Sequence, residues 1–183
     1  SVDISVCFDL LAFDKSSTGE DLYKAAFNEL VERRYSNYTH YYTDGSKKDE
    51  IASYGAYADQ LEDPRDGSGK RVSLGVFSRR ICDYSSIFTA EAEGIIAALK
   101  HIKMSPRFTG KFVVFSDSKS VLESIQSQNS KNVTLKEINE MIQVIHRQSR
   151  KVIEFCWVPS HRKIAGNEKA DEAAERARRR EPD

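Results

Sequence analysis

The sequence contains few cysteines, a single tryptophan, no excess of charge and no long hydrophobic run, and these shortages exclude several classes of protein. The three cysteines, Cys7, Cys82 and Cys156, are far apart and form no Cys-x-x-Cys pair, which argues against a disulfide framework and against a structural zinc site. A reducing intracellular compartment, the nucleus or the cytoplasm, is therefore expected. Because no apolar run approaches the roughly 18 residues of a membrane span, no membrane contact is expected.

The positive and negative charges of the chain balance. Lysine and arginine number 28, and aspartate and glutamate also number 28, so the formal net charge is zero. The chain as a whole therefore has no electrostatic attraction to polyanions, and any such contact has to come from local basic patches.

The length and the hydrophobic content predict one domain with its own core. A chain of 183 residues with 39% hydrophobic residues can bury a full core. It begins without an initiator methionine or a basic leader, so we interpret it as part of a longer polypeptide. Residues 1–37 are predicted to be a connector from an upstream region, residues 38–178 the main domain, and residues 179–183 a basic tail that frays.

The hydrophobic pattern predicts an α/β domain with a five-stranded mixed sheet flanked by helices. Three antiparallel strands come first, and the later alternation of strands with helices indicates parallel additions. In the connector, a helix is predicted over residues 20–34, and its apolar face consists of Leu22, Ala26, Phe27 and Leu30. The other predicted elements are strands over 38–43, 53–58, 71–78, 111–116 and 151–158, and helices over 89–103, 118–126, 134–147 and onward from an N-cap at Asn167.

Asp44 ends the first predicted strand, in the sequence Thr43-Asp44-Gly45-Ser46. Asp-Gly is a common hairpin turn, and the turn is the favoured interpretation when these residues are taken alone. The alternative is a carboxylate at a strand tip that coordinates a hard cation, where Gly45 lets a ligand approach the backbone.

Glu91 lies on the apolar face of a predicted helix. Its neighbours at i+4, i+7, i+8 and i+11 are apolar, so its side chain should point to the sheet. An ionised carboxylate in that position is costly unless it is paired or bound to a metal, and a buried salt bridge is the alternative to a metal. Glu93 lies about 200° further round the helix and is predicted to be a solvent-exposed acid without a role.

Asp117 and Asp171 each have a structural and a functional interpretation. Asp117 follows an apolar strand and precedes a predicted helix, so a helix N-cap and a ligand position at a strand end are both open. Asp171 sits in the first turns of the last helix, beside a stripe of alanines, where the helix dipole tolerates negative charge. Neither acid indicates a function by itself.

Four segments together resemble type 1 ribonuclease H domains. They are TDGS at 43–46, TAE followed by an apolar helix at 89–99, FSDSKSVL at 115–122, and WVPSH-x-x-x-A-G-N-E-x-A-D at 157–171. Each motif is weak alone, but the four in this order are specific. The wording Ser-Ile-Phe-Thr-Ala-Glu-Ala and Val-Pro-Ser-His most resembles the ribonuclease H domains of reverse transcriptase polyproteins from non-long-terminal-repeat retrotransposons.

The resemblance implies an endoribonuclease that hydrolyses the RNA strand of RNA/DNA hybrids by a two-metal-ion mechanism and leaves 5′-phosphate and 3′-hydroxyl ends. It implies that Asp44, Glu91, Asp117 and Asp171 hold two Mg²⁺ ions, for which Mn²⁺ can substitute. His161 would be the loop histidine that assists the reaction. The implied partners are the hybrid itself and a reverse transcriptase domain, fused or separate, and the isolated domain is expected to be monomeric.

The same resemblance indicates how the substrate would be held. The backbone at Gly45 and Ser46, with Glu91, would sense the 2′-hydroxyl that distinguishes RNA from DNA. Cellular relatives often carry a protruding helix rich in tryptophan and lysine that grips the hybrid, whereas residues 129–150 contain a single mixed-charge helix. Binding by the isolated chain should therefore be weak. The expected phosphate contacts are Lys119, Arg162, Lys163 and Arg178 to Arg180.

Two other functions stay open from the sequence. A DNA-cutting enzyme of the same fold, such as an integrase, transposase or resolvase, would also use clustered acids, although the NEKAD helix and the histidine before it argue against one. A spacer or a non-catalytic hybrid-binding module of a retroelement polyprotein is the second alternative. Four clustered acids argue against that module, since they would repel phosphates.

Overall fold

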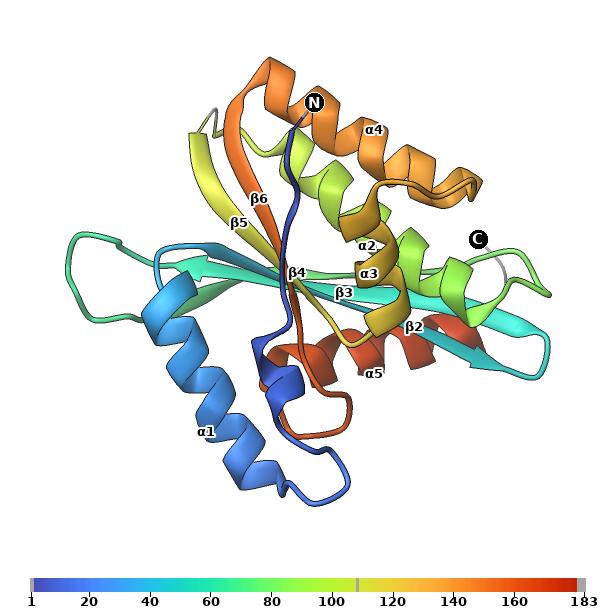
Figure 1. The fold of residues 1–183 in the computed structure, drawn as a ribbon, viewed down its shortest axis with the longest axis horizontal. Coiled ribbons are helices and arrows are strands. Elements are labelled where there is room, and N and C mark those ends of the chain that lie inside the picture. Colours follow the sequence, from blue (N-terminus) through green and yellow to red (C-terminus); the bar gives the residue numbers. More distant parts are fainter. Residues whose placement is uncertain (1, 108, 181–183) are drawn as a thin grey trace.

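Six strands form one mixed sheet in a computed structural model that describes residues 2–107 and 109–180 (Figure 1). The strand order is β1-β6-β5-β2-β3-β4. The antiparallel part and the parallel additions follow the prediction for an α/β domain. The antiparallel strands are β2 (Thr39–Lys48), β3 (Ile51–Leu61) and β4 (Arg71–Arg80), and the parallel additions are β5 (Thr109–Ser116), β6 (Arg150–Trp157) and β1 (Ser5–Cys7).

The prediction of five strands is wrong by one, because β1 lies in the segment that was interpreted as a connector. This strand has only three residues and pairs in parallel with β6 at the edge of the sheet, with Cys7 opposite Cys156. A strand so short has no detectable alternation of its own. Its conformation depends on β6, which is distant in the sequence.

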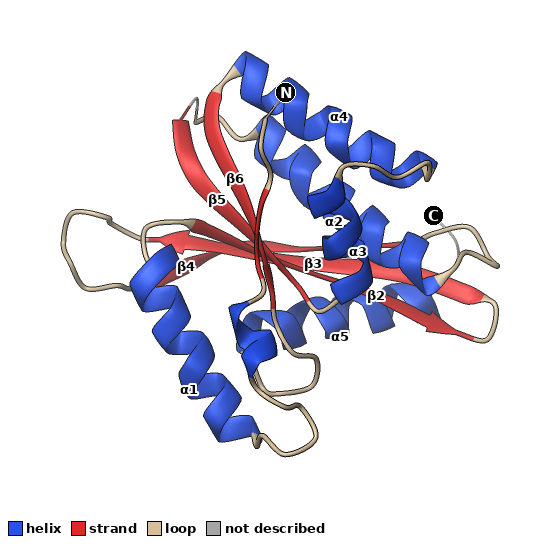
Figure 2. Ribbon diagram, in the orientation of Figure 1, coloured by secondary structure: helices blue, strands red, loops and turns tan. Residues whose placement is uncertain are grey.

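Helices cover both faces of the sheet (Figure 2). Helices α2 (Ile87–Met104), α3 (Lys119–Ser127) and α4 (Val133–Gln148) lie on one face, and α1 (Glu20–Leu30) and α5 (Ala165–Arg179) lie on the other. Helix α2 begins two residues before its predicted start because the Ser86 hydroxyl accepts a hydrogen bond from the backbone N–H of Thr89. Among the described residues, no helix is long and apolar enough to cross a membrane.

The first 37 residues pack against the sheet as far as the structure describes them. Tyr23, Phe27 and Leu30 of α1 are buried, whereas Leu22 is 54% exposed. The prediction of Leu22 on the inner face is therefore wrong, because the spacing of 23, 27 and 30 gives the face that packs. A single π-helical turn, Val31–Tyr35, continues α1 toward β2. The assignment of residues 1–37 as a connector to an upstream domain stays a prediction.

The last helix extends into the predicted tail. Helix α5 continues to Arg179, where the sequence predicted the start of a frayed tail. Residues 181–183 of that predicted tail lie outside the described residues.

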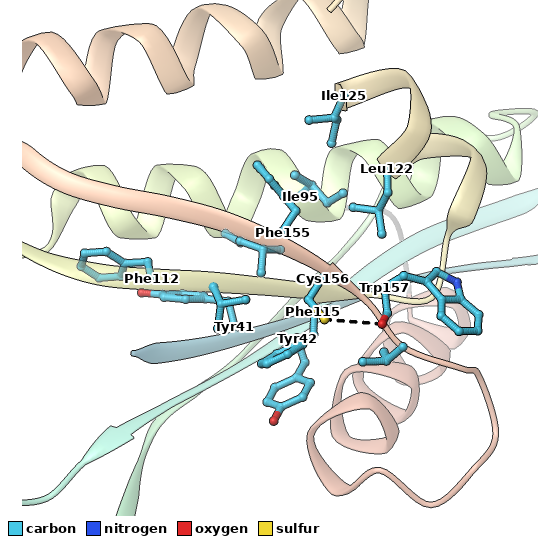
Figure 3. Packing of buried hydrophobic residues seen from close by; sticks show 14 of the residues in the cluster. Tyr41, Tyr42, Ile95, Phe112, Phe115, Leu122, Ile125, Phe155, Cys156 and Trp157 are labelled. Carbon is cyan, nitrogen blue, oxygen red and sulfur yellow. Dashed lines mark hydrogen bonds between the residues drawn. The ribbon is translucent and has the colours of Figure 1, made fainter. Parts of the chain in front are cut away.

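Aromatic side chains from both central strands fill the core (Figure 3). Tyr42 of β2 and Phe115 of β5 stack at 4.8 Å between ring centroids, and Phe27 of α1 packs on both rings. Phe115 is fully buried and Tyr42 is 5% exposed. Because Tyr42 and Phe115 each lie two residues before an acid, Asp44 and Asp117, this cluster fixes the place where β2 and β5 bring those acids together.

Candidate metal site

Asp44 and Asp117 meet because β2 and β5 are parallel neighbours. Their last paired residues are Thr43 and Ser116, so the next residue of each, Asp44 and Asp117, come close together where the two strands separate. Asp44 is 6% exposed, and Asp117 is partly buried. The two acids meet as the sequence argument expected, but the prediction that Asp44 ends its strand, as a turn or as a strand tip, is wrong. Strand β2 continues to Lys48 because residues 44–48 pair with β3, so Asp44 lies inside β2, just after its pairing with β5 ends.

Glu91 reaches the same place from α2, which packs closely on β2 at Gly45. A Cβ at Gly45 would lie 2.7 Å from the backbone nitrogen of Glu91 and 3.0 Å from the carbonyl carbon of Ala90. The absence of a side chain at Gly45 therefore allows the helix to approach. The Gly45 backbone N–H donates a hydrogen bond to the Glu91 carboxylate, which directs that carboxylate toward Asp44.

The carboxylates of Asp44, Glu91 and Asp117 form a buried cluster. One carboxylate oxygen from each lies within 4.8 Å of the others. Glu91 is 7% exposed, and its Oε2 has no hydrogen-bond partner. In residues 2–107 and 109–180, no lysine, arginine or histidine forms an ion pair with Glu91. The buried salt bridge that the sequence left open is therefore not formed.

Asp117 does not cap the helix that follows it. The N-cap of α3 is Ser118, and no side chain bonds to the first turn there. The Asp117 carboxylate is directed instead at the other acids and interacts with Asp44 by a side-chain hydrogen bond. The sequence left two interpretations open for Asp117. The structure agrees with a position at the end of a strand and does not agree with a helix N-cap.

Asp171 and His161 lie at the rim of the cluster. The Asp171 side chain is 27% exposed, and it interacts with Asp44 by a hydrogen bond and by charge repulsion. His161 Nδ1 lies 3.9 Å from Asp171 Oδ2, and the His161 side chain is 76% exposed. The structure therefore brings all five predicted residues together, three in the buried cluster and two beside it.

Burial and mutual repulsion raise the pKa values of the clustered acids. The pKa of Asp44 is raised to about 11, first by burial and then by the charges of Asp117, Glu91 and Asp171. Burial likewise raises the pKa values of Glu91 and Asp117, and neighbouring acids add to the effect. Acids in this state are stabilised in their charged form by a bound cation.

Asn167 is a site residue that the sequence analysis missed. It was predicted to be the N-cap of the last helix, but α5 begins at Ala165 with Ile164 at the N-cap. Asn167 instead lies in the first turn, is 3% exposed, and donates a side-chain hydrogen bond to Asp117 that lowers the pKa of that acid. The Trp157 indole N–H also donates to the backbone carbonyl oxygen of Asp117 at 3.2 Å.

Two residues expected at the substrate contact each other. Arg178 Nε donates a hydrogen bond to the Ser46 hydroxyl at 3.0 Å and so links α5 to the end of β2.

Glu93 lies on a different side of α2 from the cluster and is half-buried, not fully exposed as predicted. The charges of Lys100 and Arg79 favour its ionised form.

The donor set fits a hard divalent cation. Carboxylate oxygens are the ligands that Mg²⁺ and Mn²⁺ prefer, and the group contains no cysteine or histidine that would favour a softer metal. The Glu91 oxygen without a partner is a buried acceptor that such a cation would satisfy. The fold and this cluster define an α/β protein with a carboxylate site suited to divalent cations, at the carboxyl end of β5 and the adjoining part of β2.

The sequence profile of the RNase H family matches residues 36–179. The chain therefore belongs to the RNase H family. No match was found among curated protein sequences.

Solved structures of RNases H share this fold. The N-terminal RNase H domain of Rv2228c from Mycobacterium tuberculosis is 26% identical, with a TM-score of 0.57, over 76% of this chain and 98% of that one. RNase H1 from the halophilic archaeon Halobacterium salinarum is 20% identical, with a TM-score of 0.57, over 76% and 96%. LC11-RNase H1, in complex with an RNA/DNA hybrid, is 22% identical, with a TM-score of 0.54, over 76% and 98%.

Proposed function

We propose that this chain is an endoribonuclease that hydrolyses the RNA strand of RNA/DNA hybrids with divalent metal ions held by Asp44, Glu91, Asp117 and Asp171. The observation that carries the proposal is the buried group of three acids where β2 and β5 separate, in which Glu91 has no ion-pair partner among the described residues. Membership of the RNase H family supports the reaction class. The hybrid bound to LC11-RNase H1 supports the substrate class.

When bound, two divalent cations would activate a water for in-line attack on the phosphodiester and stabilise the leaving 3′ oxygen, without a covalent intermediate. Asp44 is the central residue, since its side chain interacts with all three other acids. Glu91 and Asp171 flank it from helices on opposite faces of the sheet. Mg²⁺ is the expected ion, and Mn²⁺ is its expected substitute.

Other residues of the site orient these ligands and handle protons. Asn167 and Trp157 hold Asp117 through its carboxylate and its backbone, which limits the geometries that the carboxylate can adopt. His161 is proposed to move a proton between solvent and the reacting phosphate, and its exposed position next to Asp171 supports this role. The products are expected to carry 5′-phosphate and 3′-hydroxyl ends.

We also propose, from the motif wording alone, that the chain removes template RNA during retrotransposon reverse transcription, together with a reverse transcriptase in the nucleus or the cytoplasm. Gly45 and Ser46 are proposed to meet the RNA strand near its 2′-hydroxyl groups. These statements rest on the sequence, and the experiment below tests the activity on which they depend.

The test is a gel assay with one RNA sequence presented as a hybrid, as a single strand and as RNA duplex, and with duplex DNA of the same sequence. We expect internal cuts in the RNA of the hybrid with Mg²⁺ or Mn²⁺ and no cuts with excess chelator. Equal cutting of hybrid and single-stranded RNA would contradict the proposal. Cutting of duplex DNA would favour a DNA-cutting enzyme, and binding without cutting would favour a hybrid-binding module.

A further inference from the structure

The loop that carries His161, residues 158–164, is held by the N-terminal segment of the chain. Figure 1 shows the dark blue segment before α1 beside the loop that leads into α5. This N-terminal segment precedes residue 36, where the match to the RNase H family begins. It is therefore an addition to the part of the chain that the family accounts for.

Residues 13–23, which we call the N-terminal clamp, make several contacts with this histidine loop. Lys15 Nζ donates a hydrogen bond of 2.6 Å to the hydroxyl of Ser160, the residue before His161. Arg162, the residue after His161, donates a hydrogen bond of 3.0 Å to the Lys15 carbonyl oxygen. Glu20 forms an ion pair with Lys163 at 3.2 Å. Both neighbours of His161 are thus fixed to the clamp.

Tyr23 makes the clamp a rigid support. Its side chain is fully buried, its hydroxyl donates to the Phe13 carbonyl oxygen at 3.3 Å, and the two rings pack edge to face. The guanidinium of Arg162 lies over the Tyr23 ring at 5.8 Å from its centroid, within the range of a cation–π contact. Arg162 also donates to the His161 carbonyl oxygen at 3.2 Å, so one side chain joins Tyr23, Lys15 and the histidine backbone.

The histidine loop needs external support because its backbone is strained. His161 has φ of 54° and Lys163 has φ of 57°, a left-handed conformation that side chains rarely adopt without surrounding contacts. The His161 ring does not supply such contacts, since it is 76% exposed and approaches Asp171 only at 3.9 Å. The position of the ring therefore depends on the backbone of the loop.

We propose that the N-terminal clamp positions His161 for the reaction, so that Lys15 and Tyr23 are positioning residues that act through the histidine loop. The inference rests on the proposed function, because His161 has a role only if the site cleaves. It also gives the N-terminal segment a part in catalysis that the family fold alone does not require.

The test compares the double variant Lys15→Ala/Tyr23→Leu with Lys15→Arg/Tyr23→Phe, which retains the charge and the ring. Glu29→Gln, at an exposed position on α1 outside the clamp residues 13–23, is the control. We expect the first variant to lower kcat about tenfold with KM within about twofold. The conservative variant should restore most of kcat, and the control should behave as the wild type does.

The same variants in a His161→Ala background decide whether the clamp acts through the histidine. There, Lys15→Ala/Tyr23→Leu should cause no further fall in kcat, because the group that it positions is gone. An equal fall in both backgrounds would overturn the proposal, and so would a rise in KM with unchanged kcat. If Tyr23→Leu does not fold, Lys15→Ala/Glu20→Gln replaces it, since both side chains are exposed.

A second readout is independent of cleavage. In the metal-free protein, the ring ¹H–¹³C resonances of His161 should shift and broaden in Lys15→Ala/Tyr23→Leu and stay unchanged in Glu29→Gln. Unchanged resonances in both variants would refute the clamp even in an active enzyme. If the wild type cleaves no hybrid but the resonances shift, the proposed function fails and the contact between clamp and loop stands.

Discussion

At the scale of single residues, two glutamates on α2 allow a residue of the metal site to be compared with a close neighbour outside it. Glu91 is 7% exposed and lies in the acid cluster, whereas Glu93, two residues later, is directed to another side of the helix. Glu91→Gln should lower the rate of hybrid cleavage by at least about a hundredfold because it removes a metal ligand. Glu93→Gln should leave the rate within about twofold. Initial rates under saturating Mg²⁺ measure both, and equal losses would mean that the two faces are assigned wrongly.

The sequence predicted the acids of the candidate site mainly through the four motifs taken together. Of the four acids, Glu91 alone occupied a position, on an apolar helix face, that requires a partner for its charge. Asp44, Asp117 and Asp171 each had an ordinary structural interpretation as a turn, a cap or a helix-start acid. Asn167 gave no such signal, since a polar residue at a helix start is expected to be a cap. Its actual partner, Asp117, becomes its neighbour only when α5 packs on the sheet.

At the scale of elements, the site depends on the packing of α5 against β3, because α5 carries Asp171. At Gly55, a Cβ would overlap the backbone of α5 at Ala170 and Ala174. Gly55→Ala should therefore push the helix away from the sheet and lower the free energy of unfolding by about 1–3 kcal/mol. Cleavage should fall as well, because Asp171 moves with the helix.

Gly19→Ala is the matched control, since a Cβ there meets nothing within 4 Å. It should change the free energy of unfolding by less than about 0.5 kcal/mol. Urea denaturation of the two variants and the wild type measures the difference. If Gly55→Ala is as stable as Gly19→Ala, the close packing of α5 on β3 is not what holds Asp171 in place.

The elements that the sequence missed or placed wrongly depend on distant partners. Strand β1 exists because β6 offers an edge, and α5 starts two residues before its predicted cap because Gly166 fits under Tyr42, where a Cβ would overlap the ring. The central strands and α2 have enough periodicity to be predicted from their own residues. Local patterns therefore predicted five of the strands, including the edge strand β4, but missed the three-residue strand β1 and ended β2 five residues early, at Thr43.

The whole molecule should lose stability with rising pH when no metal is bound. The raised pKa values of Asp44, Glu91 and Asp117, caused mainly by burial, mean that the folded state binds more protons than the unfolded state. The stabilising contribution is complete below the unfolded pKa, near 4, and is lost as pH rises through the folded pKa values. The free energy of unfolding in chelator should therefore be lower at about pH 8 than at about pH 5.

Mg²⁺ should reverse this trend, because it binds the charged acids of the folded state and displaces their protons. Its stabilising effect should be larger at about pH 8 than at about pH 5. Urea denaturation at both pH values, with Mg²⁺ and with chelator, tests the sign. Equal stabilisation at both pH values, or greater stability in chelator at the higher pH, would show that the acids do not titrate as one metal site.

For the whole molecule, the central claim is that Asp44, Glu91, Asp117 and Asp171 hold the divalent metal ions with which the protein cleaves RNA. The most direct measurement is the initial rate of RNA cleavage in a hybrid, as Mg²⁺ is raised, for the wild type, Asp44→Asn and Asp49→Asn. Asp49 is an exposed acid in the β2–β3 turn with φ of 57°, where asparagine fits well. We expect the wild type and Asp49→Asn to cleave alike and Asp44→Asn to show no cleavage at any Mg²⁺ concentration. Cleavage by Asp44→Asn at the wild-type rate would contradict the account.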